Sequence, residues 1–123
     1  MPKHSLSDAA AVQLAAAKDA PSGVSSEILV GDEDSSLTQT VVALTEGHSM
    51  SVRESPEEAT LLVLSGSVRV RTARGPEDAS KGDLVEIPTD PHTITAEKDV
   101  TALLTVADDH DGQTEVSSTG PPG

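Results

Sequence analysis

Serine and histidine are the first side chains to consider for nucleophilic catalysis in this chain, because it has no cysteine. The absence of cysteine excludes disulfides, thiolate metal sites and cysteine nucleophiles. Serines are frequent, but no Gly-x-Ser-x-Gly elbow exposes one of them as a nucleophile. A Ser-His-acid triad is defined by geometry, which residue counts do not supply. The sequence therefore predicts no catalytic residue.

Acidic residues and glycines could form a second kind of site, for cations or phosphates. The acidic pairs at 57–58 and 108–109 are typical of a solvated surface. The acidic run at 32–34 indicates a charged turn, with weak calcium binding as the alternative, although it lacks the spaced oxygens of an EF-hand loop. Gly75 and Gly82 form no phosphate-binding pattern and indicate turns. None of these groups predicts a specific ligand.

The charge and composition of the whole chain exclude several kinds of partner. Its 21 acidic and 8 basic side chains give a formal charge of −13, which repels nucleic acid and anionic membranes. Without Phe, Tyr or Trp, the chain cannot stack unpaired bases or cage a quaternary ammonium. No apolar run approaches the roughly 20 residues that span a bilayer, and the N-terminus is too polar for a secretory signal. We expect a cytoplasmic protein with no nucleic-acid or membrane partner.

An alanine-rich segment predicts one helix near the N-terminus. Ser5 or Ser7 can cap a helix over residues 8–19, and the Pro-Ser-Gly sequence at 21–23 ends it. Three residues supply its sizeable apolar bulk: Leu6, Val12 and Leu14. We therefore expect residues 1–24 to form an arm that lies on the main body or on a neighbouring subunit.

The rest of the chain has the two-residue period of strands, with Gly, Pro, Asp and Ser between them. The predicted strands cover residues 26–30, 36–45, 48–53, 59–65, 67–73, 83–87, 92–97 and 99–107. We expect a turn at 65–66 and a loop at 73–76. Residues 25–107 then form one domain, and the polar tail at 108–123 is predicted to be disordered because it has little apolar surface.

Two segments predict which strand faces are buried. Val68 and Val70 share one face while Arg69 and Arg71 share the other, which indicates a strand with one wet side. Residues 61–64 are apolar on both faces. One face can fill a core, and the other needs a cover, either the helix or a second subunit. The second option predicts a homodimer.

The spacing of several residues in this β-rich region resembles the first of two cupin motifs. That motif runs Gly, five residues, His-x-His, three or four residues, Glu, six residues, Gly. Gly47 and Gly66 fit its frame, and Arg53, Ser55 and Ala59 stand in its ligand positions.

The second cupin motif runs Gly, five residues, Pro-x-Gly, two residues, His. Gly82, Pro88 and His92 fit it, with one residue fewer before the histidine. The resemblance covers about residues 38–107 and implies an all-β fold, the cupin double-stranded β-helix, a jelly-roll-like barrel with a short N-terminal α-helix.

The cupin resemblance also implies a metal site, usually of three histidines and a glutamate, and this chain departs from it. Only His92 stands in its expected position, and arginine at 53 has no lone pair to give and repels a cation. We therefore predict no metal and no cofactor; if there is one, it is a divalent metal at His92. A set rebuilt from His92, Glu58 and one more oxygen is the alternative. Strict alternation puts His48 on the opposite face from Arg53, and His4 and His110 are expected on the surface.

If Arg53 and His92 occupy the positions of the cupin motifs, both point into the mouth of the barrel. In a structural interpretation, Arg53 pairs with a nearby acid and His92 bonds to a backbone group. The acids available are Glu54, Glu58 and Asp90. In a functional interpretation, Arg53 holds the carboxylate of a small ligand bidentately, and His92 donates or accepts a proton. The predicted ligand-binding residues are Arg53, His92 and Ser55.

Three functions follow from these residues. We predict a metal-free cupin that binds a small molecule, which can be an anion. The first alternative is a metal-dependent cupin enzyme, of the dioxygenase or isomerase type, with a reduced or rebuilt ligand set. The second is a dimeric structural or interaction module with a vestigial pocket.

Overall fold

A computed structural model describes residues 3–32, 34–52 and 58–107 of the chain. These ranges form one helix and nine strands. In chain order, the elements are α1 (Leu6–Asp19), β1 (Val24–Val30), β2 (Leu37–Leu44), β3 (Ser49–Val52), β4 (Glu58–Ser65), β5 (Ser67–Thr72), β6 (Gly75–Ser80), β7 (Leu84–Ile87), β8 (His92–Ala96) and β9 (Val100–Ala107). The prediction of an all-β fold with one short N-terminal helix is confirmed.

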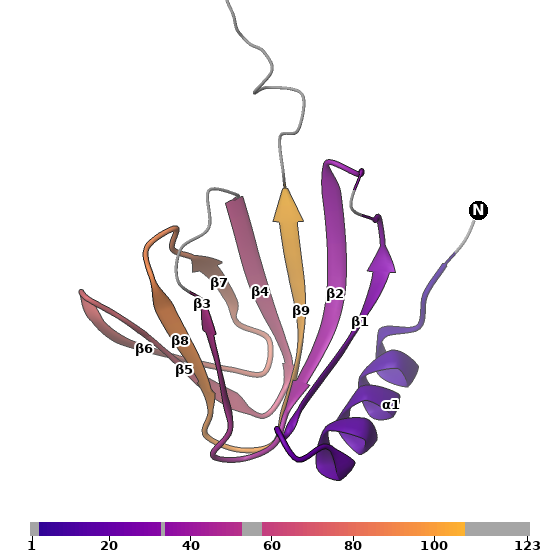
Figure 1. Ribbon diagram of the computed structural model, residues 1–123, viewed down its shortest axis with the longest axis horizontal. Helices are drawn as coiled ribbons and strands as arrows, with labels where there is room; N and C mark the ends of the chain where they lie inside the picture. The colour runs from indigo at the N-terminus through magenta and orange to yellow at the C-terminus, as the bar shows by residue number, and fades with distance from the viewer. Residues whose placement is uncertain (1–2, 33, 53–57, 108–123) are drawn as a thin grey trace, which may run out of the picture.

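The strands form two antiparallel sheets that lie face to face (Figure 1). The five-stranded sheet has the order β1-β2-β9-β4-β7, and the four-stranded sheet has the order β3-β8-β5-β6. Within the described ranges, the strand pairing does not join the two sheets into one closed barrel. Neighbours such as β2 and β9 are far apart in sequence, as expected when the chain passes back and forth between two sheets.

The loop predicted at 73–76 is present only at Ala73 and Arg74, and strand β6, which the sequence did not predict, starts at Gly75. Thr72 already pairs with Gly75, so the connection from β5 is a two-residue hairpin. The segment that follows contains Gly, Pro, Glu and Asp, which are depleted in strands, and this hid it in the sequence. β6 is an edge strand, which is where Pro76 is tolerated.

An ion pair between β5 and β6 holds this edge strand. Arg69 binds both carboxylate oxygens of Asp78, with Nε 2.6 Å from Oδ1 and Nη2 3.0 Å from Oδ2. Its Nη2 also lies 3.4 Å from Oε2 of Glu97. The hydrogen bond from Arg69, more than its charge alone, lowers the pKa of Asp78, and the same pair raises the pKa of Arg69. The predicted wet face of this strand is therefore present and carries a specific cross-strand pair.

The inner faces of the two sheets form an entirely aliphatic core. Its buried residues are Val42, Leu44, Leu61, Val63, Val68, Val70, Ala79, Ile94, Ala96, Val100 and Ala102. Met50, Val85, Ile87 and Leu104 pack around them. Since no aromatic ring is available, the space is filled by many small side chains from both sheets.

Helix α1 packs on the outer face of the five-stranded sheet, against β2 and β1 and, to a lesser extent, β9 (Figure 1). The Ser5 side chain caps it by accepting a hydrogen bond from the backbone N–H of Asp8 at 3.3 Å. This confirms one of the two predicted caps. The helix is the only one in the described ranges, and it is neither long nor apolar enough to cross a membrane.

The buried face of α1 differs from the one that bulk alone suggested. Its buried residues are Ala10, Gln13 and Ala17, whereas Val12 is 61% exposed. Small alanines let the helix approach the sheet closely. The Gln13 amide is satisfied there, because its Oε1 accepts from Ser25 Oγ at 2.5 Å and its Nε2 donates to Glu27 Oε1 at 3.3 Å.

The helix leaves part of this outer face uncovered. On this face, Leu62 of β4 pairs with Leu103 of β9 on one side and with Leu84 of β7 on the other, so the three leucines form an apolar row. Leu84 is 64% exposed. The helix mainly contacts β1, β2 and β9, whereas the cover was predicted for residues 61–64 on β4. The homodimer stays a prediction that concerns the row at β4 and β7.

The interior has two distinct ends. At one end, the turn between β4 and β5 lies against the turn before β9. A Cβ on Gly66 would stand 2.0 Å from the backbone oxygen of Asp99, so only glycine allows this approach. At the other end, β3 finishes opposite the start of β8, with Val52 paired to His92. We call this second end the mouth.

Candidate functional site

His92 is the polar residue that the fold places inside the mouth. It shares a strand face with Ile94 and Ala96, which belong to the core, and it is only 5% exposed. Its Nδ1 lies 2.9 Å from the backbone oxygen of Asp90. Because a carbonyl oxygen can only accept, Nδ1 must carry a proton and donate it. In the neutral ring, Nε2 then keeps the lone pair.

Ala59 and Glu58 stand at the start of β4, on opposite faces. Ala59 pairs with Ile87 and Val106, and it shares the inner face with the core residue Leu61. The position that holds a glutamate in the cupin motif is therefore hydrocarbon here. Glu58 is exposed, on the face away from the interior. The alternative metal site that includes Glu58 would require the start of β4 to rotate so that the Glu58 side chain faces the interior.

His48 lies at the end of the interior away from the mouth. It stands just before β3, whose last residue pairs with His92. His48 and Val52 are four strand residues apart, which corresponds to about 13 Å. The His48 ring lies over Gly23, and its Nδ1 is 2.9 Å from Thr45 Oγ1. It therefore joins the arm to the β2–β3 turn and takes no part in the mouth.

The remaining predicted site residues, Arg53 and Ser55, lie outside the described residues, as does Glu54. His4 is exposed, and His110 falls in the undescribed tail. The structure therefore brings His92, Ala59 and the backbone of Asp90 to the mouth.

The described part of the mouth does not fit a metal centre of the cupin kind. Among the described residues, no three His, Asp or Glu side chains come together in a way that could hold a metal ion. His92 supplies one nitrogen, Nε2, since Nδ1 is bonded to the backbone. A divalent ion in a protein usually takes three or more protein ligands.

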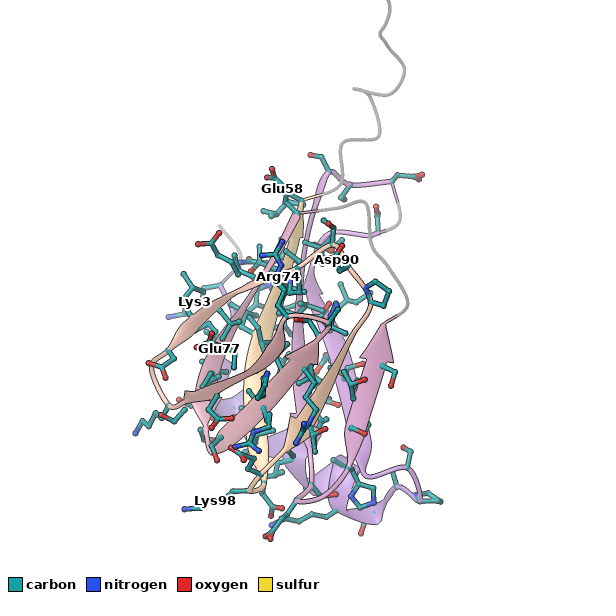
Figure 2. All side chains as sticks on the ribbon, turned by 90° about the vertical axis from the view of Figure 1, so that its left-hand side faces the viewer. Lys3, Glu58, Arg74, Glu77, Asp90 and Lys98 are labelled. Carbon is teal, nitrogen blue, oxygen red and sulfur yellow. The ribbon has the colours of Figure 1, made fainter. Side chains whose placement is uncertain are left out.

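The structure has a cavity beside the mouth that the sequence did not predict. It has a volume of about 230 Å³ and opens along the seam between the β5–β6 hairpin and β7. Val70 and Val85 are among the residues that line it. Arg74 and Asp90 also line it, and Figure 2 labels both side chains. Arg74 could have been found from the sequence only by recognising the two-residue hairpin that carries it.

The charges around this seam cavity disfavour an anion. Arg74 is its single basic residue, against three acidic ones, Glu77, Glu86 and Asp90. A carboxylate ligand would meet net negative charge there. The seam cavity is therefore a poor site for an anion.

Comparison with solved structures decides the fold. The Cupin_2 domain of an XRE family transcriptional regulator from Enterobacter cloacae matches with a TM-score of 0.61 and 14% identity, covering 69% of this chain and 96% of that domain. A cupin superfamily protein from Desulfitobacterium hafniense matches with a TM-score of 0.63 and 20% identity, over 70% and 78% of the two chains. The chain has the cupin fold.

The cupin fold is shared by proteins of different function. A variant of salicylate 1,2-dioxygenase from Pseudoaminobacter salicylatoxidans matches with a TM-score of 0.70 and 18% identity, over 86% of this chain and 34% of the enzyme. No family model and no curated protein matches the sequence. At these identities, the likeness concerns the fold, and function must be argued from the site.

Proposed function

We propose that this protein binds a small carboxylate at the mouth of its cupin interior without using a metal ion. Arg53 holds the carboxylate, His92 donates a hydrogen bond to it from Nε2 in the form of the ring that carries both protons, and Ser55 adds a hydroxyl. The observation that carries the proposal is the buried imidazole of His92, whose Nδ1 is bonded to Asp90 while no partner of Nε2 is found among the described residues. A buried polar atom without a partner is unfavourable. A carboxylate oxygen can only accept, so it becomes the partner of Nε2 when that nitrogen also carries a proton.

The position of arginine in the sequence supports an anion rather than a cation. Arg53 directly follows Val52, the strand partner of His92, so strict alternation would put Arg53 on the face opposite to His92. The proposal therefore requires a β-bulge or a bend after Val52 that turns the guanidinium toward the mouth. A guanidinium stays protonated and matches a carboxylate with two parallel hydrogen bonds. The same charge would repel a metal ion. With Ala59 in the glutamate position, the described residues give a cation little to bind.

Thermal unfolding tests the proposal. The protein is heated with acetate, pyruvate or salicylate, the last because it is named in one matched enzyme. Acetamide, which has the shape of acetate without its charge, is the matched control. A ligand at ten times its Kd stabilises the folded state by about 1.4 kcal/mol. For a domain of this size, the melting temperature should rise by roughly 6–10 °C.

Two variants connect that rise to the mouth. Arg53→Ala should remove it, while Arg74→Ala, which deletes a guanidinium from the seam cavity at the same end, should keep it. A carboxylate that stabilises the parent and Arg53→Ala equally would contradict the proposal. So would a panel in which no acid shifts the parent more than acetamide does. Stoichiometric iron, manganese, nickel or zinc in protein purified without chelators would favour the metal-dependent alternative.

A further inference from the structure

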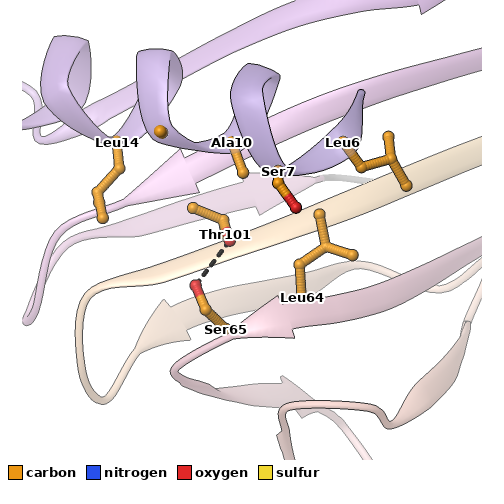
Figure 3. Close-up of a pocket in the computed structure, with 8 residues that line it drawn as sticks. Leu6, Ser7, Ala10, Leu14, Leu64, Ser65 and Thr101 are labelled. Carbon is orange, nitrogen blue, oxygen red and sulfur yellow. Dashed lines mark hydrogen bonds between the residues drawn. The ribbon is translucent and has the colours of Figure 1, made fainter. Parts of the chain in front are cut away.

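A groove between α1 and the five-stranded sheet is separate from the mouth (Figure 3). Its volume is about 340 Å³. Leu6 and Leu14 on the helix and Leu64 on β4 form apolar walls, and Ser65 and Thr101 lie between them. The groove lies on the outer face of the sheet, whereas the mouth belongs to the inner face.

The floor of this groove carries a buried hydroxyl pair. Thr101 is only 3% exposed, and its Oγ1 lies 2.7 Å from Ser65 Oγ. Hydroxyl pairs of this kind are common between neighbouring strands. One of the two protons is used within the pair, and the other hydroxyl proton has no acceptor among the described residues. The groove therefore offers two hydrogen-bond donors among hydrocarbon, the free proton of this pair and the Ser7 hydroxyl.

The lining of the groove contains no charged residue, although the chain has 21 acidic and 8 basic side chains. Leu6 and Ser7, which line it, are the first two residues of α1, and the first N–H groups of a helix carry partial positive charge. The hydroxyl donor on the floor and the start of the helix both favour an electronegative oxygen of a ligand. The absence of a basic side chain disfavours a full negative charge, because an anion there would be desolvated without a partner.

We propose that this groove binds a small neutral aliphatic molecule with one carbonyl or hydroxyl oxygen. The oxygen accepts the available proton of the Ser65–Thr101 pair, and the hydrocarbon part lies along Leu6, Leu14 and Leu64. At about 30 Å³ for each water-sized group, the volume admits roughly eleven such groups. A ketone or alcohol of six to eight carbons, on the order of that capacity, fits the space.

Titration of the ¹⁵N-labelled full chain with 2-heptanone, followed by amide NMR shifts, tests this site. The amides of Ser65 and Thr101 should shift saturably, and that of His92 should stay in place. The double variant Ser65→Ala/Thr101→Val removes both hydroxyls of the pair, so it should weaken binding about fivefold, the effect of one net hydrogen bond. Ala11→Leu fills the groove from an exposed helix position and should abolish binding, while Ala16→Leu, exposed and outside the lining, should not.

The outcomes that overturn this proposal differ from those that concern the mouth. No saturable shift, or equal binding by the parent and Ala11→Leu, would show that the groove is not a site. Unchanged affinity in Ser65→Ala/Thr101→Val, or tighter binding of heptanoate than of 2-heptanone, would refute the neutral acceptor. A solution mass of two chains that falls to one in Ala11→Leu would show that a second copy fills the groove. None of these results depends on Arg53 or His92.

Discussion

Two glycines of the first cupin motif should differ in how much they matter to stability. Both Gly66 and Gly47 have positive φ, +79° and +86°, where a side chain is strained. Alanine in a left-handed conformation costs about 1–2 kcal/mol at either position. A Cβ on Gly47 would meet nothing within 4 Å, whereas one on Gly66 would stand 2.0 Å from the Asp99 oxygen and 2.9 Å from the Val100 Cα. Relieving that overlap adds about 1–3 kcal/mol.

Urea unfolding of the two alanine variants measures the difference. Gly47→Ala should lose about 1–2 kcal/mol, and Gly66→Ala about 2–5 kcal/mol. With a denaturant dependence of about 1–3 kcal/mol per molar urea, the two midpoints should be separated by roughly 1 M. Equal midpoints, or a smaller loss at position 66, would refute the contact between the β4–β5 turn and the turn before β9. Carboxylate binding at the mouth, which lies at the other end of the interior, should be the same in both variants.

Three further predictions concern other parts of the fold. Because the Asp78 pKa is lowered in the folded state, its pair with Arg69 stabilises the protein above the unfolded Asp pKa of about 3.9, and this contribution is lost as the pH falls through the folded pKa. In Arg69→Gln, an NMR titration should give a higher Asp78 pKa, and unfolding should depend less on pH in this acid range; an unchanged Asp78 pKa would contradict the ion pair. Gln13→Ala removes the amide between the helix and β1 and should cost about 1–3 kcal/mol in denaturant unfolding; a loss near zero would mean that water replaces the amide. If the apolar row at β4 and β7 forms a homodimer, the parent should have twice the 12.6 kDa chain mass by sedimentation and Leu84→Lys should have the single mass; a monomeric parent would refute the dimer.

Much of the fold could be predicted because local patterns and the strand periodicity agree. The alternation of Val68 and Val70 with Arg69 and Arg71 gave the correct buried face of β5. Strand β6 could not be predicted, because its residues disfavour strands and the pairing of Arg69 with Asp78 that supports it comes from the tertiary fold. Strand partners such as β2 and β9 are likewise set by packing between segments far apart in the sequence.

The site could be predicted less well than the fold. The inward direction of His92 follows from the second motif, but its bond to the Asp90 carbonyl depends on how the loop before β8 bends. The buried face of α1 was missed because Gln13 is polar. The burial of Gln13 depends on its hydrogen bonds to Ser25 and Glu27 on β1. The seam cavity and the groove under the helix exist only once separate elements are packed, so no local sequence pattern indicates them.

A crystal structure of protein purified without chelators, soaked with the carboxylate that raises the melting temperature most, tests the central claim most directly. We predict a carboxylate with one oxygen within hydrogen-bonding distance of His92 Nε2 and both oxygens held by the Arg53 guanidinium. An anomalous metal peak bonded to Nε2, or an Arg53 side chain turned to solvent beside an empty mouth, would contradict a metal-free anion site.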